Sequence, residues 1–465
     1  MRTRSAPLAI SSSPERTGWE RFVSRTVPSV TLLQQVTAER LLVFFLGVSI
    51  FVSKSGIYAA TVFLVLYFLV RLATSPECRA FFRSEKLAIA SVVLYLLGLA
   101  VTVAYPGHIE DVSVYARKGA FLLLIPPLMF AFRDPATRRV ALVGLVLGFW
   151  LDFIHTFHEL DWVWSGGMVA GATWKQDQWS VMLALFLAFL VPIALEKRWS
   201  LEKTILMGTL GAATLALLMA GGRGPWLGVV LAVTLYMVFQ QRRAMLYFIG
   251  LSLLLYIPAH TLYEEQVGYL KNRLQSIGDL QENVSNRWRM EFWTFTANYN
   301  FHMLKNDQKA FLLGSGPIHQ EERITDFIEE TGVKESDRYV FIRDRSEWKV
   351  NDAHNLYLDS LGKMGLIWTV SVLVFLILLV RSGWAANRST FSRWSAATAL
   401  LVFLFIGIFY SILAHFASFA LVLFMTLALG SRAPCRHDLQ LTDSACERDP
   451  VLSEGLGSEG RAGPT

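Results

Sequence analysis

Charged side chains are scarce in this sequence. Of its 465 residues, 17% are Asp, Glu, Lys or Arg and 53% are hydrophobic, and the mean hydropathy is +0.41. A soluble domain carries about 25% charged residues. The composition therefore excludes a soluble globular protein. It predicts an all-α membrane protein that crosses the bilayer many times, because backbone polar groups in lipid must be satisfied within helices.

Cysteine is also rare, and cofactor-binding motifs are absent. The three cysteines, Cys78, Cys435 and Cys446, fall in segments predicted to be cytoplasmic, so no disulfide is expected. Their spacing matches no zinc site, and the sequence has no Gly-rich phosphate loop, heptad array or internal repeat. The first apolar run begins too late for an ordinary signal peptide, so residues 1–40 are expected to form a cytoplasmic tail.

Positive charge is unevenly distributed along the chain. The net charge of +6 and the pI of about 9.1 would suit a protein that binds nucleic acid. However, residues 261–355 contain twelve Lys or Arg and sixteen Asp or Glu, and the basic excess lies in the N-terminus and in every second short loop. This positive-inside pattern indicates membrane topology rather than a phosphate-binding stripe. It predicts cytoplasmic termini and an outward-facing 261–355 loop, which in a bacterial inner membrane is periplasmic.

The apolar segments predict about twelve membrane spans in a helical bundle. Nine spans lie in residues 41–260 and three in residues 356–430, on either side of the 261–355 loop. Residues 431–465, rich in Gly, Ser and Glu, are predicted to be a disordered cytoplasmic tail. The predicted spans are Leu41–Val52, Ile57–Val70, Leu87–Ala104, Gly119–Phe132, Val140–Phe157, Trp179–Leu195, Thr204–Ala220, Trp226–Phe239, Ala244–Ile257, Leu356–Val380, Trp394–Tyr410 and Leu413–Leu429.

The loop between the ninth and tenth spans is too long to be a simple connection. Apolar residues at helical spacing predict helices at Leu262–Leu280 and at Asn286–Tyr299, the second with Ser285 or Asn286 as its N-cap. A turn is predicted at Gly314 to Pro317, and Asn351 or Asp352 is expected to cap the tenth span.

Two outward-facing arginines are candidates for phosphate binding. Arg223 lies in the Gly221–Gly228 turn at the bilayer edge, where a charge is costly unless it is used or solvated; a snorkelling side chain is the simpler alternative. Arg289 lies one helical turn before Trp293. It either stacks on that ring or presents its fork of donors to a diphosphate.

His354 is the candidate for proton transfer. It comes directly before the tenth span, at the end of the loop. An imidazole at this boundary is suited to accept a proton from a hydroxyl, although an isolated histidine there is more often a capping or interfacial residue.

The order of these elements resembles the O-antigen ligase and O-antigen polymerase superfamily, which also includes bacterial O-linked oligosaccharyltransferases. Apolar spans are followed by a Gly-Arg-Gly turn, a loop with Arg-x-x-x-Trp, a Gly-x-Gly turn and His-Asn-x-x-Leu, from about Trp174 to Leu378. The resemblance implies a metal-independent, inverting glycosyltransferase of the membrane GT-C type. It implies that Arg223 and Arg289 bind the diphosphate of an undecaprenyl-linked glycan donor and that His354 activates the acceptor hydroxyl.

Other polar residues are weaker candidates for the same site. Lys175, Gln176 and Gln178 precede the sixth span, where members of the superfamily often carry polar residues. Arg343 and Arg345 approach His354 in the sequence and could add positive charge, and Arg287 could replace Arg289 if the helix phase differs. For each of them a solvated surface position is the simpler interpretation.

The layout looks most like that of the ligases, which implies lipid A–core as the acceptor and no cofactor. The sequence has no outward Asp-x-Asp pair, which agrees with a reaction that needs no metal. A polymerase, a protein O-oligosaccharyltransferase acting on Ser or Thr, and a non-enzymatic flippase or transporter of lipid-linked glycans remain alternatives. Few charges in mid-span and no paired broken helices argue against transport.

Overall fold

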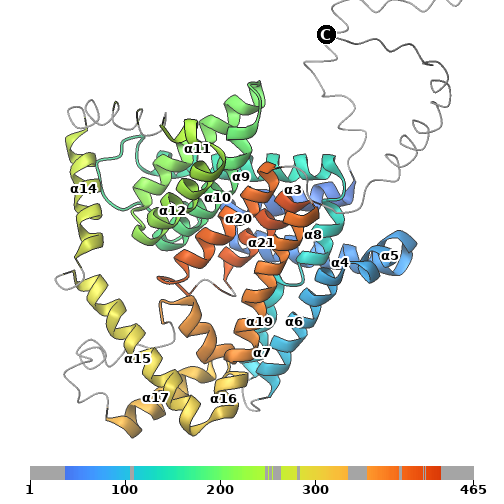
Figure 1. Ribbon diagram of the computed structural model, residues 1–465, viewed down its shortest axis with the longest axis vertical. Coiled ribbons are helices and arrows are strands. Elements are labelled where there is room, and N and C mark those ends of the chain that lie inside the picture. The colour runs from blue at the N-terminus through green and yellow to red at the C-terminus, as the bar shows by residue number, and fades with distance from the viewer. Residues whose placement is uncertain are drawn as a thin grey trace, which may run out of the picture.

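The computed structural model describes residues 37–104, 109–246, 250, 254, 263–279, 283–332, 353–386, 390–411, 413 and 415–430, and every regular element among them is helical (Figure 1). The predicted all-α class is confirmed. The helices are α3 (Ala38–Val52), α4 (Lys54–Thr74), α5 (Pro76–Ser84), α6 (Lys86–Val103), α7 (Ile109–Lys118), α8 (Ile125–Ala131), α9 (Pro135–Glu159), α10 (Gln176–Glu196), α11 (Leu201–Ala220), α12 (Arg223–Gln240), α14 (Glu264–Gly278), α15 (Val284–Asn306), α16 (Gln308–Leu313), α17 (His319–Thr331), α19 (Leu356–Ala386), α20 (Thr390–Ile406) and α21 (Phe416–Leu429), with a 3-10 turn at Gly119–Phe121.

Seven helical stretches of the described chain are long and apolar enough to cross a membrane, so the protein is a multi-pass helical membrane protein. The full count of about twelve spans stays a prediction. Most of the predicted ninth span, Ala244–Ile257, lies outside the described residues, as do nearly all of the predicted N-terminal tail, the tail 431–465, Cys435 and Cys446. Cys78 is a buried free thiol in α5, a short helix within a segment predicted to be one of the basic loops.

Helix α10 forms the centre of the bundle. Its residues Val181–Leu190 are all buried, because the helix is apolar on every face and has neighbours on every side. Phe189 stacks on Phe424 of α21 with ring centroids 5.0 Å apart, and the Thr398 hydroxyl of α20 donates to the Ala188 carbonyl at 2.6 Å. These contacts join the sixth and the last two predicted spans into one core.

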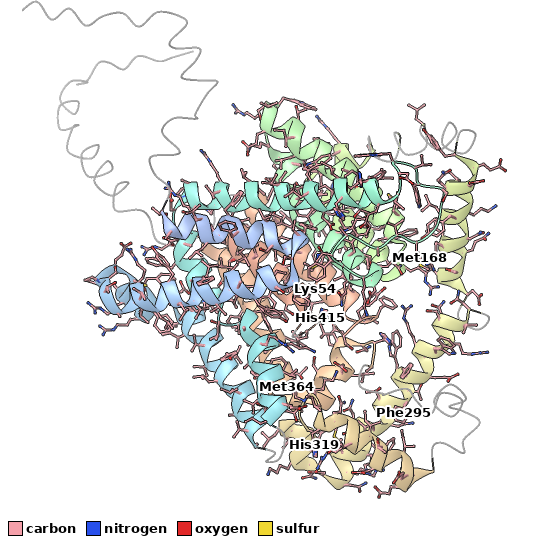
Figure 2. All side chains as sticks on the ribbon, turned by 180° about the vertical axis from the view of Figure 1, so that it is seen from behind. Lys54, Met168, Phe295, His319, Met364 and His415 are labelled. Carbon is pink, nitrogen blue, oxygen red and sulfur yellow. The ribbon has the colours of Figure 1, made fainter. Side chains whose placement is uncertain are left out.

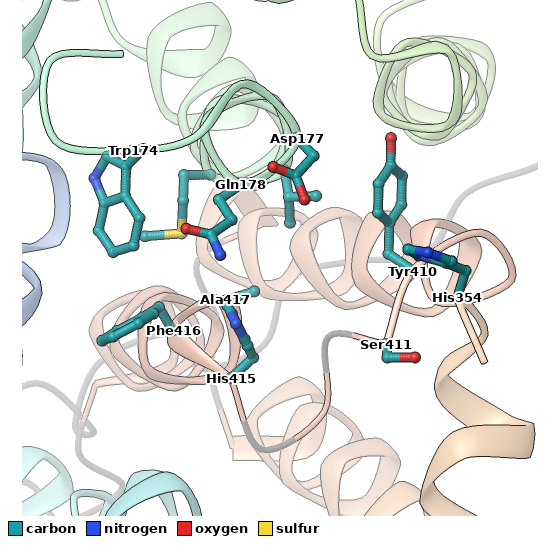
Figure 3. Close-up of a pocket in the computed structure, with 11 residues that line it drawn as sticks. Trp174, Asp177, Gln178, His354, Tyr410, Ser411, His415, Phe416 and Ala417 are labelled. Carbon is teal, nitrogen blue, oxygen red and sulfur yellow. The ribbon is translucent and has the colours of Figure 1, made fainter. Parts of the chain in front are cut away.

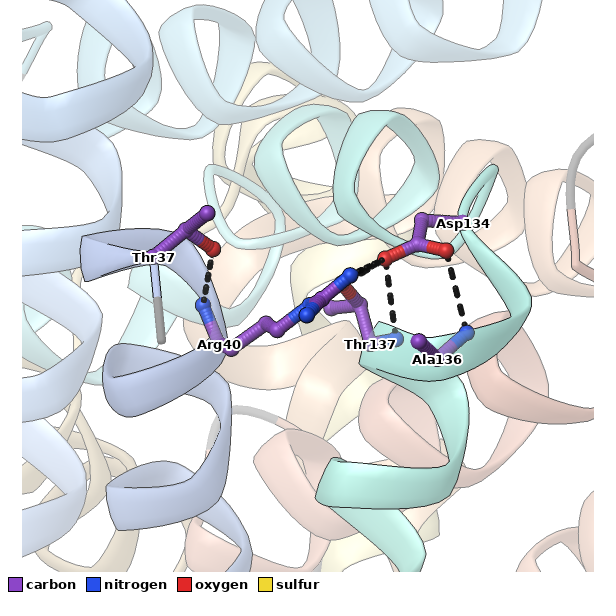
Figure 4. A network of polar contacts seen from close by, with 5 residues as sticks. All are labelled: Thr37, Arg40, Asp134, Ala136 and Thr137. Atoms are coloured by element: carbon purple, nitrogen blue, oxygen red, sulfur yellow. Dashed lines mark hydrogen bonds and ion pairs between the residues drawn. The ribbon is translucent and has the colours of Figure 1, made fainter. Parts of the chain in front are cut away.

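Helices α3 and α9 pack closely along their length. A Cβ at Gly148 would lie 2.5 Å from the Val48 carbonyl oxygen, so only glycine allows the two backbones to approach this far. At one end of the pair, Asp134 caps α9 and accepts a 2.9 Å bond from Arg40 of α3 (Figure 4). Burial alone would raise the pKa of Asp134, but hydrogen bonds from Arg40, Thr137 and the Ala136 amide hold that pKa below its usual range.

Three of the predicted spans have the wrong boundaries. The predicted span Gly119–Phe132 is the second half of a longer candidate span, Ile109–Ala131, and consists of a 3-10 turn followed by the short helix α8. Pro126 and Pro127 lie in the first turn of α8, which is where a helix accepts proline. The predicted eleventh span ends at Ile406 rather than at Tyr410, and the twelfth begins at Phe416 rather than at Leu413. A non-helical connection therefore replaces the very short turn that the apolar pattern suggested.

The polar segment between α12 and α19 forms helices α14 to α17, which lie along one side and one end of the bundle (Figure 1). Both predicted loop helices are present as α14 and α15, and the predicted turn at Gly314 to Pro317 is confirmed. The N-cap of α15 is Asn283 rather than Ser285 or Asn286, since its side chain accepts from the Asn286 amide. The helices α15 to α17 enclose a small core of their own, built on Phe295, Tyr299, Met303, Ala310, Ile324, Phe327 and Ile328.

A break in α19 attaches this helical loop to the bundle. Gly365 has φ 77° and ψ 170°, which interrupts the helix. The carbonyl groups of the turn before Gly365 therefore lose the backbone amides that would donate to them in a continuous helix. Ser315 supplies its amide and hydroxyl to the Gly362 carbonyl at 3.2 and 2.8 Å, and the Gly316 amide donates to the Lys363 carbonyl at 2.9 Å. The predicted Gly-Ser-Gly turn therefore satisfies the backbone that the break exposes.

Candidate functional site

His354 lies at the junction between the polar segment and α19. Its φ of +47° is a left-handed conformation that is costly for a residue with a side chain, so its surroundings must hold it. The Trp293 indole of α15 donates to the His354 carbonyl at 3.3 Å, and the Phe292 ring lies edge-on to the imidazole at 6.1 Å. Strained backbone conformations are found most often at active and ligand-binding sites, which supports His354 as a candidate.

Asn355 caps α19 directly after the histidine. Its side-chain oxygen accepts from the Tyr357 and Leu358 amides at 3.0 and 3.1 Å, and its amide donates to the Ile408 carbonyl at 3.0 Å. The expected caps, Asn351 and Asp352, lie outside the described residues. Asn355 thus fixes the start of α19 against the connection that carries Tyr410.

Arg289 of α15 points toward this connection. Its guanidinium lies 5.7 Å from the centre of the Tyr410 ring, and the side chain is half-buried. Arg287, two residues earlier, is exposed, so the phase of the helix favours Arg289 as the residue that faces the site. Within the described residues, the ring that Arg289 contacts is that of Tyr410, whereas Trp293 packs against Phe409 with ring centroids 6.0 Å apart.

Arg223 is the first residue of α12 and follows a sharp hinge. Gly221 has φ +64°, and a Cβ at Gly222 would lie 2.5 Å from the Ser180 hydroxyl of α10, so the hinge is pressed against the bundle. The Arg223 guanidinium donates to the carbonyl and the hydroxyl of Ser276 in α14, at 2.8 and 3.1 Å. The arginine therefore spans from the bundle to the helical loop and is not a snorkelling side chain.

Arg223 and Arg289 are close enough to Tyr410, and to each other, to interact electrostatically. Arg223 interacts electrostatically with Arg289, with Arg273 of α14 and with Tyr410. Tyr410 in turn interacts with all three arginines and with Asp177 at the start of α10. Like charges repel when they are brought together in a partly desolvated place, so a cluster of three guanidinium groups indicates a site for a multivalent anion.

A pocket of about 110 Å³ opens beside this cluster (Figure 3). Figure 3 shows His354 beside Tyr410 on one wall, and Trp174, Asp177 and Gln178 on the facing side. The Gln178 side-chain oxygen is buried and has no hydrogen-bond partner within the described part of the chain. The pocket is lined by Trp174, Asp177, Gln178, Val181, Met182, His354, Tyr410, Ser411, His415, Phe416 and Ala417.

The weaker candidates separate into three groups. Gln178 lines the pocket, whereas Lys175 is exposed and Gln176 donates to the Ala220 carbonyl at 2.5 Å, which supports the α11–α12 hinge. Arg343 and Arg345 lie outside the described residues. Within the described ranges, no group of three His, Cys, Asp or Glu side chains is placed to hold a metal ion.

Four residues of the site were not identified from the sequence. Tyr410 and His415 were missed because the apolar pattern placed both inside predicted spans. Asp177 was missed although it stands between the candidates Gln176 and Gln178. Arg273 looked like part of the solvated face of an amphipathic helix. The sequence signal for Tyr410 and His415 was the very short gap between the last two predicted spans, which begins at Ser411. A gap this short indicates that one of the spans ends earlier or begins later than the apolar pattern suggests.

The fold and site define a multi-pass helical membrane protein with a histidine-bearing pocket, flanked by arginines, where a polar helical loop meets the bundle. Residues 208–373 match the model of the family described as O-Antigen ligase, and this segment contains Arg223, Arg289 and His354. The resemblance found in the sequence is confirmed for this segment of the chain. A comparison with curated proteins gives no match.

Proposed function

We propose that this protein is an O-antigen ligase. It transfers the glycan from undecaprenyl diphosphate to lipid A–core at the periplasmic face of the bacterial inner membrane, with inversion and without a metal. The observation that carries the proposal is the contact of Arg289 with Tyr410, which lines the same pocket as His354. Arg223 and Arg273 add positive charge near enough to act electrostatically on that tyrosine. The family match supports transfer of an O-antigen-type glycan in general terms.

The reaction is a displacement at the anomeric carbon of the donor. The acceptor hydroxyl attacks from the face opposite the diphosphate, a new C–O bond forms, and the bond to the phosphate oxygen breaks with its electron pair. Undecaprenyl diphosphate leaves with an added negative charge, which Arg223 and Arg289 stabilise. His354 accepts the proton of the attacking hydroxyl, a role that typically accelerates a reaction by about 10²–10⁴-fold.

Substitution of His354 tests the proposal. His354→Ala and Arg289→Ala should each abolish the lipopolysaccharide ladder in intact cells at normal expression, because one loses the base and the other a donor to the leaving group. Arg287→Ala is the matched control, since Arg287 is exposed on the same helix and should leave the ladder intact. A full ladder with His354→Ala would remove this histidine from the mechanism.

Deletion of the gene separates the ligase from the other members of the superfamily. A ligase mutant should accumulate core without O-antigen, a polymerase mutant should carry core with a single unit, and a protein transferase mutant should contain unglycosylated protein. Purified protein that moves lipid-linked glycan across vesicles without forming a glycosidic bond would instead indicate a transporter.

A further inference from the structure

A second cavity lies next to the candidate pocket. It has a volume of about 310 Å³ and is enclosed by α7, the turn before α17, the first half of α19 and the connection that leads to α21. Ser411 and His415 line both cavities, so the two spaces share a wall. Figure 2 labels two lining residues, Met364 and His415, in the region between the bundle and the helical loop.

The charged side chains that line this cavity are two lysines and one aspartate. Lys118 ends α7, and Lys363 pairs with Asp359 one turn away on α19, with a shortest N–O distance of 2.7 Å. Asp359 also accepts from the Ala353 amide at 3.3 Å, so its oxygens are engaged by the protein. The lining as a whole therefore has an excess of positive charge, to which Ser360 and Ser411 add hydroxyl groups.

The walls of the cavity are held rigidly. The buried Asp111 of α7 accepts hydrogen bonds from the amides of Ile318 and His319 and so fixes the turn before α17. The same helix is fixed to α19, because the Trp368 indole donates to the Tyr115 hydroxyl at 3.2 Å and both rings are buried. A cavity with fixed walls and fixed cations loses little entropy when an anion binds.

We infer that this second cavity binds an anionic group on the acceptor glycan, a phosphate or a sugar carboxylate, with Lys118 and Lys363 as its cationic ligands. The inference rests on the proposed function and adds to it the chemical class of the acceptor. The shared wall brings a glycan held here next to His354 and Tyr410, which line the first pocket. Asp359 joins the two spaces, since it pairs with Lys363 and binds the residue before His354.

Binding of soluble core oligosaccharide to the purified full-length protein tests the inference without any transfer reaction. Lys118→Gln should weaken binding roughly ten- to a hundredfold, because a charge-assisted hydrogen bond is lost. Lys118→Arg should restore most of the affinity. Arg117→Gln, an exposed neighbour on α7 that changes charge equally, should bind as the wild type does. Equal affinity of wild type and Lys118→Gln would overturn the inference.

Modified oligosaccharides distinguish the two sources of the anion. Phosphatase treatment should abolish the effect of Lys118→Gln if the ligand is a phosphate, and reduction of the carboxyl groups should abolish it if the ligand is a carboxylate. If the fully neutralised oligosaccharide binds as tightly as the untreated one, the cavity does not recognise an anion.

Steady-state transfer assays separate this inference from the proposed function. Lys118→Gln should raise KM for the acceptor and leave kcat nearly unchanged, whereas His354→Ala should abolish transfer and still bind the oligosaccharide. Wild-type protein that binds the oligosaccharide but never transfers to lipid A–core would overturn the proposed function alone. Unchanged KM in Lys118→Gln would overturn the inference alone.

Discussion

Two helices that border the candidate site, α10 and α14, are buried to opposite extents. Helix α10 is enclosed along most of its length, whereas α14 has no buried residue. Both nevertheless contribute polar groups to the same arginine cluster, Asp177 from α10 and Arg273 and Ser276 from α14. One wall of the site is therefore part of the protein core, and the other is a surface helix.

The difference suggests how a site for a large lipid-borne substrate can be both ordered and accessible. Segments with few buried apolar contacts open at low free-energy cost, while core helices open only with the whole protein. Arg223 connects the two walls: its hinge packs on Ser180 of α10, and its guanidinium binds Ser276 of α14. If the arginines bind the donor diphosphate as proposed, the diphosphate can replace the contact with α14 without disturbing the core.

Hydrogen exchange should reveal the largest difference between the two helices. Amides of α14 are expected to exchange on the order of 10³-fold faster than those of α10, because local opening costs range from near zero up to the global stability. Mass spectrometry of peptides from both helices in the same detergent sample provides the measurement. Equal protection of α14 would mean that the loop is as firmly packed as the core.

Removal of the arginine that joins the two walls should have the next largest effect. Arg223→Ala is expected to lower the rate of glycan transfer about 10²–10³-fold, since one donor to the leaving group is lost. Transfer from purified lipid-linked donor to lipid A–core is the assay. Arg243→Ala, an exposed arginine beyond the other end of α12, is the control that should transfer normally. A loss below tenfold would remove Arg223 from the diphosphate site.

A substitution on the buried wall should reduce stability. The Trp179 indole donates to the buried Asp152 carboxylate at 2.6 Å, so Trp179→Phe leaves a buried acceptor without this partner at a cost of about 1–3 kcal/mol. Thermal unfolding in detergent measures the change. Trp150→Phe is the control, because its partner, the Thr209 hydroxyl, keeps its bond to the Ile205 carbonyl. Equal melting temperatures of the two variants would contradict this account.

The sequence predicts the buried wall better than the connections. The predicted span Trp179–Leu195 agrees closely with α10, because a continuous apolar run with polar ends determines such a helix. Tyr410 was placed inside a span for the same reason, and wrongly. The chain leaves the helix after Ile406, where the Gly407 carbonyl accepts from the Leu356 amide at 2.6 Å, a partner distant in sequence. No local pattern records such a contact.

The sequence also identifies only part of the candidate site, because some of its residues are brought there by tertiary packing. Arg223, Arg289 and His354 are recognisable because their residue types stand out near apolar segments and occur in a known order. Arg273 has the spacing of an ordinary solvated residue on an amphipathic helix, and only the packing of α14 beside the α12 hinge brings it to Arg223. Residues that join a site through tertiary packing of a surface helix cannot be distinguished in one sequence from residues that face water.

The smallest effect is expected on the surface wall itself. Ser276→Ala removes the hydroxyl that lies 3.1 Å from the Arg223 guanidinium but keeps the backbone carbonyl at 2.8 Å, so transfer should fall less than about tenfold. The same transfer assay applies, with the exposed neighbour Gln275→Ala as control. If Ser276→Ala instead reduced transfer as strongly as Arg223→Ala, α14 would be needed to orient the arginine during the reaction. The two walls would then act as one rigid site, contrary to their difference in burial.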